Sequence, residues 1–67
     1  MTKQEARKIL VREAKIFKYF GNTPEDFINA LQNEPWRLSA NSVEDAYYLI
    51  SEELCHIIPW VWNPVNG

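Results

Sequence analysis

Apolar residues recur at helical spacing over the first twenty residues of the chain. Steps of three and four positions bring side chains onto one face of a helix. Thr2 followed by Glu5 forms the capping-box pattern of a helix start, and Gly21 is the residue type that most easily ends a helix in the left-handed conformation. The pattern predicts a helix over about residues 3–20, with an apolar face formed by Ala6, Ile9, Leu10, Ala14, Phe17 and Phe20.

A second helix start follows directly after this stop. Thr23 precedes Pro24, a residue that suits the first helical position, and Asp26 lies three residues after the cap. Pro35 forces an end, because the residue before a proline is pushed out of the helical region. A second helix is therefore predicted over about residues 24–33, with its inward face formed by Phe27, Ile28 and Leu31.

The third helix is predicted to start at Ser42, with Asp45 as the reciprocal capping residue, and to end at Pro59. This gives a helix over about residues 43–58, whose inward arc contains Val43, Ala46, Tyr47, Ile50, Leu54, Ile57 and Ile58. Together the three helices predict an all-α fold, a compact three-helix bundle that forms a single small helical domain over residues 1–67.

The final segment, residues 59–67, contains two prolines and two of the three tryptophans. The prolines disfavour a helix, so we expect an extended aromatic C-terminal tail. Trp60 and Trp62 would expose a large apolar area if the tail were free. We therefore expect the tail to be ordered and to contribute to the stability of the fold.

The length of 67 residues allows one domain with a small core, because a chain of this size buries only about 60% of its unfolded surface. Its apolar fraction of 46% is typical of a globular protein. No apolar run reaches the roughly 20 residues that span a bilayer, and the first residues do not form a signal peptide. The single cysteine, Cys55, fits a reducing compartment, so we expect a cytoplasmic protein without membrane association.

Few residues could support catalysis or bind a metal ion. His56 follows Cys55 directly, so on a helix their side chains point about 100° apart and cannot share one proton or one metal. Glu52 and Glu53 lie one helical turn before His56, a geometry that could hold a divalent ion with two ligands, whereas a typical site has three or four. We expect no enzymatic activity, no cofactor and no metal site.

Charge is distributed unequally along the chain. Residues 1–21 carry six basic and two acidic side chains, a net charge of +4, whereas residues 22–67 carry one basic and seven acidic side chains, a net charge of −6. The first helix therefore has a basic face, which suits phosphates, an acidic protein surface or the acidic half of this same chain. The six basic residues are Lys3, Arg7, Lys8, Arg12, Lys15 and Lys18.

The basic face leaves two interpretations open. In the first, the basic helix pairs with the two acidic helices of its own bundle and needs no partner. In the second, it binds the phosphates of a nucleic acid. The sequence pI of about 5.2 argues against the second, because specific nucleic-acid binders are usually basic over the whole domain.

The third predicted helix carries more apolar residues than one face can hold. Tyr48, Leu49 and Cys55 lie outside its inward arc. Trp36 and the tail could cover them by folding back, or the aromatic residues could form the centre of an interface, where tryptophan and tyrosine are enriched. A mixed outcome, with one tryptophan inside and another at the surface, is compatible with both interpretations.

The absence of targeting and catalytic patterns is what we would expect of a small accessory protein. We therefore expect a helical protein-binding module, a regulator or inhibitor of a larger bacterial or phage protein assembly, with a homodimer as one form of such binding. The expected partner-binding residues, on the third helix, its preceding loop and the tail, are Trp36, Tyr48, Leu49, Trp60 and Trp62. The alternative is a nucleic-acid-binding protein that uses the six basic residues of the first helix.

Overall fold

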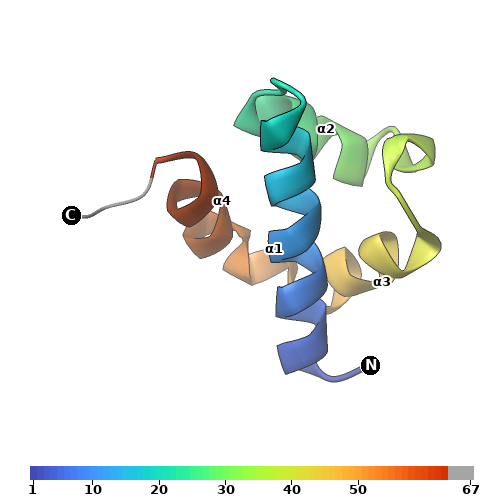
Figure 1. The fold of residues 1–67 in the computed structure, drawn as a ribbon. Helices are drawn as coiled ribbons and strands as arrows, with labels where there is room; N and C mark the ends of the chain where they lie inside the picture. The colour runs from blue at the N-terminus through green and yellow to red at the C-terminus, as the bar shows by residue number, and fades with distance from the viewer. Residues whose placement is uncertain (64–67) are drawn as a thin grey trace.

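The long first helix forms the centre of the fold. The computed structural model describes residues 1–63, which fold as α1 (Lys3–Tyr19), α2 (Pro24–Gln32), the 3-10 turn η1 (Pro35–Arg37), α3 (Asn41–Ile50), the 3-10 turn η2 (Ser51–Glu53) and α4 (Leu54–Trp62). In Figure 1, α4 lies on one side of α1 and α3 on the other, and α2 crosses the end of α1 that is farthest from the N-terminus. The predicted all-α, three-helix fold is confirmed, with α3, η2 and α4 together forming the third helical region.

The ends of α1 follow their predicted chemistry. The Glu5 N–H donates to the Thr2 hydroxyl over 3.1 Å, and the Thr2 N–H donates to the Glu5 carboxylate over 3.2 Å. At the other end Gly21 has a φ of +85°, and the Asn22 N–H donates to the Phe17 carbonyl over 3.0 Å. This is the Schellman arrangement, which needs the left-handed conformation that glycine adopts most easily.

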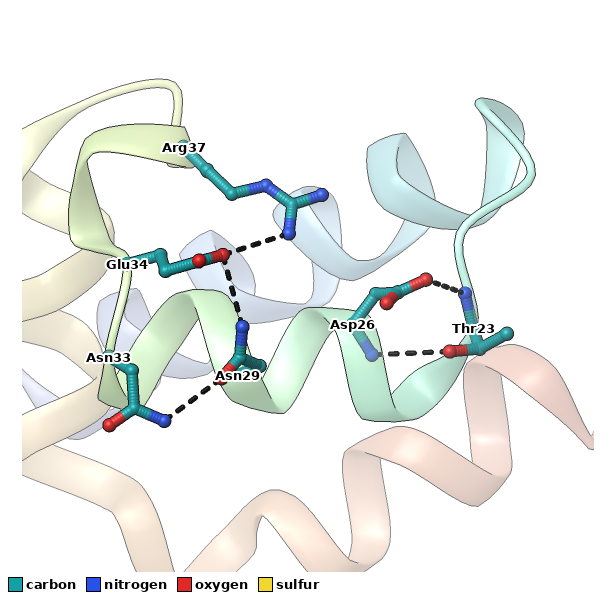
Figure 2. A network of polar contacts seen from close by, with 6 residues as sticks. All are labelled: Thr23, Asp26, Asn29, Asn33, Glu34 and Arg37. Carbon is teal, nitrogen blue, oxygen red and sulfur yellow. Dashed lines mark hydrogen bonds and ion pairs between the residues drawn. The ribbon is translucent and has the colours of Figure 1, made fainter.

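The helix α2 also begins at its predicted capping box. Thr23 and Asp26 exchange the two reciprocal bonds shown in Figure 2, and Pro24 occupies the first turn. The helix ends at Gln32, one residue before the predicted end, and the Glu34 carboxylate then accepts bonds from the Asn29 amide and the Arg37 guanidinium (Figure 2). The turn η1 is thereby fixed to the end of α2.

The start of α3 differs from its prediction. The helix begins at Asn41, its N-cap is Ala40, and no side chain caps it, so Ser42 does not act as the cap. A distant contact precedes this start: the buried Glu13 carboxylate accepts bonds from the Ser39 N–H over 2.9 Å and from the Ser39 hydroxyl over 2.7 Å. Because α1 holds the chain at residue 39, a tertiary contact replaces local capping in fixing this entry to α3.

The single helix predicted over residues 43–58 is wrong, because η2 divides this region into α3 and α4. At Ile50 the backbone leaves the helical conformation, with φ −131° and ψ +36°. A straight helix over residues 41–62 would extend about 33 Å, at roughly 1.5 Å per residue. The break instead lets α3 and α4 both pack against α1.

The predicted end at Pro59 is also wrong. Pro59 lies inside α4, which continues to Trp62, so residues 59–62 are helical and not extended. A proline inside a helix costs about 3 kcal/mol, since it removes one hydrogen bond and crowds the preceding turn. Burial of Val61 and contacts of Trp62 offset this cost. The remainder of the predicted tail, residues 64–67, lies outside the described residues.

One hydrophobic core joins all the helices. Its buried side chains come from α1, α2, α3, α4 and the residue after η1, and they are Ala6, Leu10, Ala14, Phe17, Phe27, Ala30, Leu31, Leu38, Val43, Ala46, Ile50, Ile57 and Val61. Phe20, predicted to face inward, is 74% exposed, because α1 ends at Tyr19 and Phe20 already belongs to the turn. No helix within residues 1–63 is long and apolar enough to cross a membrane.

Candidate functional site

The two tryptophans of α4 have opposite environments. Trp62 faces the core: its ring centroid lies 5.7 Å from that of Phe27, and its indole N–H donates to the Asn22 carbonyl over 3.1 Å. Both the ring and its polar atom therefore have partners within the fold. This contact ties α4 to the loop between α1 and α2, so Trp62 supports the structure and presents little surface to a partner.

Trp60 faces solvent. Its side chain is 56% exposed, and the ammonium nitrogen of Lys15 lies 4.7 Å from the ring centroid. That distance is within the range of a cation–π contact. Next to it, the Lys18 ammonium donates to the Val61 carbonyl over 2.9 Å. Trp60 is thus an exposed aromatic ring held beside the basic helix.

Three adjoining hollows follow the seam between α1 and α4. The first is lined by α1 alone, and the other two lie between α1 and the residues of η2 and α4. The largest has a volume of about 500 Å³, and all three are open to solvent. We call this surface the α1–α4 groove, and its lining residues are Arg7, Lys8, Val11, Arg12, Lys15, Lys18, Tyr19, Glu53, His56, Ile57, Trp60 and Val61.

The two walls of the α1–α4 groove differ in chemistry. The α1 wall is basic, and five of the six predicted phosphate-binding residues line it; only Lys3 does not. The opposite wall contributes Trp60 with the apolar side chains Ile57 and Val61, and one acid, Glu53. A ligand in this groove would meet cations on one side and apolar surface on the other.

One of the six basic side chains of α1, Arg7, forms an ion pair with an acidic residue of the same bundle. Arg7 donates to the Glu53 carboxylate over 2.8 Å, which lowers the pKa of Glu53 and raises that of Arg7. Among residues 1–63 the remaining ion pair, Arg37 with Glu34, does not involve α1. The basic face therefore keeps most of its charge available to a partner.

The other predicted partner-binding residues lie elsewhere. Tyr48 and Leu49 are exposed on α3, and Trp36 is 75% exposed on η1. None of them lines the three hollows of the groove. In Figure 1 the segments that carry them lie on the side of α1 away from α4. The structure thus combines Trp60 with the basic residues of α1 rather than with the other exposed aromatics.

Two residues of functional or structural weight were missed by the sequence analysis. Tyr19 is 83% exposed and shares the last hollow with Trp60; its position four residues after Lys15, on the same helical face, was the available signal. Glu13 lies between the apolar positions of Leu10 and Phe17 at helical spacing, which already placed it on the inward face. An acid at such a position indicates a buried hydrogen-bonded group.

A comparison of this chain with known protein families, curated proteins and solved structures found no match.

Proposed function

We propose that this protein is a small protein-binding module, a regulator or inhibitor of a larger protein assembly, and that it binds through the α1–α4 groove. The observation that carries the proposal is Trp60, an aromatic ring more than half exposed beside Lys15 in an open groove. Tryptophan near the centre of a surface patch is the residue type most enriched among those that dominate interface energies.

The balance of charge and apolar surface supports a protein partner. Protein interfaces combine an apolar centre with a polar rim, and the groove has apolar side chains at Val11, Ile57 and Trp60 with cations around them. Catalysis needs groups held in a site that excludes water, whereas these hollows are open. We therefore propose a binding role without catalysis, in the cytoplasm, where the exposed thiol of Cys55 would stay reduced.

Photo-crosslinking in the cells that naturally make the protein tests this proposal. A photoreactive amino acid replaces Lys8, which lines the groove, and in a matched control it replaces Glu25, an exposed residue of α2. We expect a protease-sensitive adduct at position 8 and none at position 25. The adduct should disappear with Trp60→Ala and persist with Trp36→Ala, which removes an equally large exposed ring outside the groove. Absence of a protein adduct at position 8 would contradict the proposal.

A nucleic-acid ligand is the second candidate, and one observation favours it. The rings of Tyr19 and Trp60 line a single hollow together with Lys15 and Lys18, an arrangement in which bases could stack while phosphates meet ammonium groups. Against it, Glu53 lies on the opposite wall and the chain carries a net charge of −2. A nuclease-sensitive adduct at position 8, together with a gel shift of single-stranded DNA at low salt, would favour this candidate over the first.

A further inference from the structure

Three of the cations on the α1 wall of the groove lie in one line along the helix. Lys8, Arg12 and Lys15 follow one another at steps of four and three residues, and Tyr19 continues the line after another four. Such steps place side chains in a row along one face of a helix. The three cations line the same hollow, and none forms an ion pair with an acid of residues 1–63. They form a straight row of positive charge, which we call the cation row.

An apolar strip runs beside the cation row. Val11 lines the hollow of the cation row and also the hollow that contains Ile57 and Trp60. The groove therefore offers the cation row and, beside it, an apolar strip of Val11, Ile57 and Trp60. The Arg7–Glu53 ion pair and His56 line the same hollow as this strip. A helix whose acidic residues recur at steps of three and four, with apolar residues in the next row, presents the complementary pair of strips.

The length of the row sets the length of the ligand. From Lys8 to Tyr19 the helix rises by about 16 Å, at roughly 1.5 Å per residue. A helix of about three turns laid along the groove covers the same distance. Ridges formed by steps of three and four residues on one helix pack into the corresponding grooves of another, so the charged positions of such a helix stay in register with the cation row.

We propose that the α1–α4 groove binds an acidic amphipathic helix of about three turns from a partner protein. Its carboxylates lie along Lys8, Arg12 and Lys15, and its large apolar side chains lie against Trp60 and Ile57. This inference rests on the proposed protein-binding function and names the class of segment recognised. Lys15 lies over the Trp60 ring, but no member of the cation row forms an ion pair with an acid of residues 1–63. This positive charge without an acidic partner argues for an acidic occupant.

A second copy of this chain does not supply the required helix. Its acids occur as adjacent pairs, Glu25–Asp26, Glu44–Asp45 and Glu52–Glu53, or singly at Glu5, Glu13 and Glu34. No helix of α1 to α4 carries three carboxylates at steps of three and four residues. The experiment must therefore distinguish self-association from the binding of an acidic helix of a partner protein.

Fluorescence anisotropy with the purified full chain tests the inference. The probe is a designed 16-residue amphipathic peptide with glutamates at positions i, i+4, i+7 and i+11 and leucines in the adjacent row. In one control peptide lysines replace these four glutamates, and in another two central residues are prolines, which prevent the helix. We expect the acidic peptide to bind with a Kd below about 100 µM, both control peptides to bind at least about tenfold more weakly, and binding to weaken with added salt.

Matched variants locate the binding. Arg12→Glu reverses a charge in the cation row, and Lys3→Glu makes the same change of net charge outside the groove. We expect Arg12→Glu to weaken binding by at least about tenfold, and Lys3→Glu by less than about threefold. Trp60→Ala should likewise weaken binding by about tenfold, with Trp36→Ala as its control. Circular dichroism confirms that each variant is folded before it is compared.

Several results would overturn the inference: no binding of the acidic peptide, equal binding of the lysine or proline peptide, or an equal effect of Lys3→Glu and Arg12→Glu. A dimer seen by sedimentation that Arg12→Glu disrupts would assign the groove to a second copy and would also overturn it. If the peptide fails to bind while position 8 still yields a protein adduct, the protein-binding function stands and only the acidic-helix inference falls.

Discussion

The two flanks of α1 make different kinds of contact. Toward the core the helix, which packs against α3, presents small and compact side chains such as Ala6, Leu10 and Ala14, which are fully buried, and α3 adds Ala46 and Ile50, which are buried as completely. Toward α4 it presents long charged side chains, which bond or cover α4 at its edge and leave hollows between them. One flank excludes solvent, and the other admits it.

Small buried residues let helix axes approach closely and fill the space between them, which stabilises the fold. Long charged residues keep solvent-accessible hollows open, at little gain in stability, and leave charge and apolar area for a ligand. The helix α1 thus has a structural face and a face available for binding. Substitutions on the α3 side should change stability, and those on the α4 side should change binding.

The largest expected effect is at Ile50, which is fully buried where α3 ends. Ile50→Ala should lower the free energy of unfolding by about 2–5 kcal/mol, because it removes apolar contacts and leaves a cavity. Since a domain this small has little stability to lose, most of the fold could be lost at 37 °C. Urea unfolding followed by circular dichroism measures the change. Its exposed neighbour serves as control: Leu49→Ala should cost far less, and an equal loss for both would contradict the assigned core.

Trp62 is the inward-facing tryptophan of α4, and its substitution tests whether this ring stabilises the fold. Trp62→Ala should lower the free energy of unfolding by about 2–3 kcal/mol, because the contact with Phe27 and the bond to the Asn22 carbonyl are both lost. Thermal unfolding should shift by several degrees. Removal of residues 59–67 should destabilise the protein at least as much. Unchanged melting of either variant would show that the end of α4 is not needed for the fold.

Loss of the buried Glu13 carboxylate is expected to give the next largest decrease in the free energy of unfolding. Glu13→Ala removes the buried carboxylate that accepts two bonds from the exposed Ser39, and a bond of this kind contributes about 0.5–1.5 kcal/mol. Glu13→Gln, which keeps one acceptor oxygen, should fall between the wild-type protein and Glu13→Ala in urea unfolding. A Glu13→Ala protein as stable as the wild type would show that the contact between Glu13 and Ser39 does not stabilise the fold.

Low pH should weaken the contact between α1 and η2, because it protonates Glu53, the ion-pair partner of Arg7. The pKa of Glu53 lies below the ordinary value of 4.5, chiefly because the carboxylate accepts a bond from Arg7. A lowered pKa means that the ion pair contributes stability fully above pH 4.5 and loses it as the pH falls through the lowered value. Carboxyl NMR titration should give a Glu53 pKa under 4.5 that moves upward in Arg7→Gln. A value that is the same in both proteins would show that the pair does not form in solution.

The smallest effect on stability is expected at Trp60. Trp60→Ala removes an exposed ring and one cation–π contact with Lys15, so the free energy of unfolding should fall by less than about 1 kcal/mol. The same variant should lose most of its affinity for the acidic peptide. A large loss of stability from Trp60→Ala would instead show that this ring supports the fold.

Local rules predicted the parts of the fold that depend on neighbouring residues. The capping boxes at Thr2 and Thr23 and the turn at Gly21 lie where the sequence places them, because each needs only residues within a few positions. The errors concern contacts between distant residues. Glu13 with Ser39 spans 26 positions and Trp62 with Asn22 spans 40, and such pairs are not encoded in a helical pattern.

The candidate site could be predicted only in part for the same reason. The cations of α1 followed from the spacing of lysine and arginine, whereas the sequence left open whether the tail tryptophans face the core, a partner or both. The combination of Trp60 with those cations depends on the break after Ile50, which returns α4 along α1. Periodicity over residues 43–58 continues through this break, so the sequence favoured one straight helix instead.

The three tryptophans permit a direct test of the claim that the α4 side of α1 is the binding face. Each indole N–H gives its own signal in a proton–nitrogen NMR spectrum, and the rings lie in the groove (Trp60), against the core (Trp62) and on η1 (Trp36). During titration with the acidic amphipathic peptide, we expect the Trp60 signal to move most, the Trp62 signal to move little, and the Trp36 signal to stay in place. Movement of the Trp36 signal with an unchanged Trp60 signal would contradict this claim.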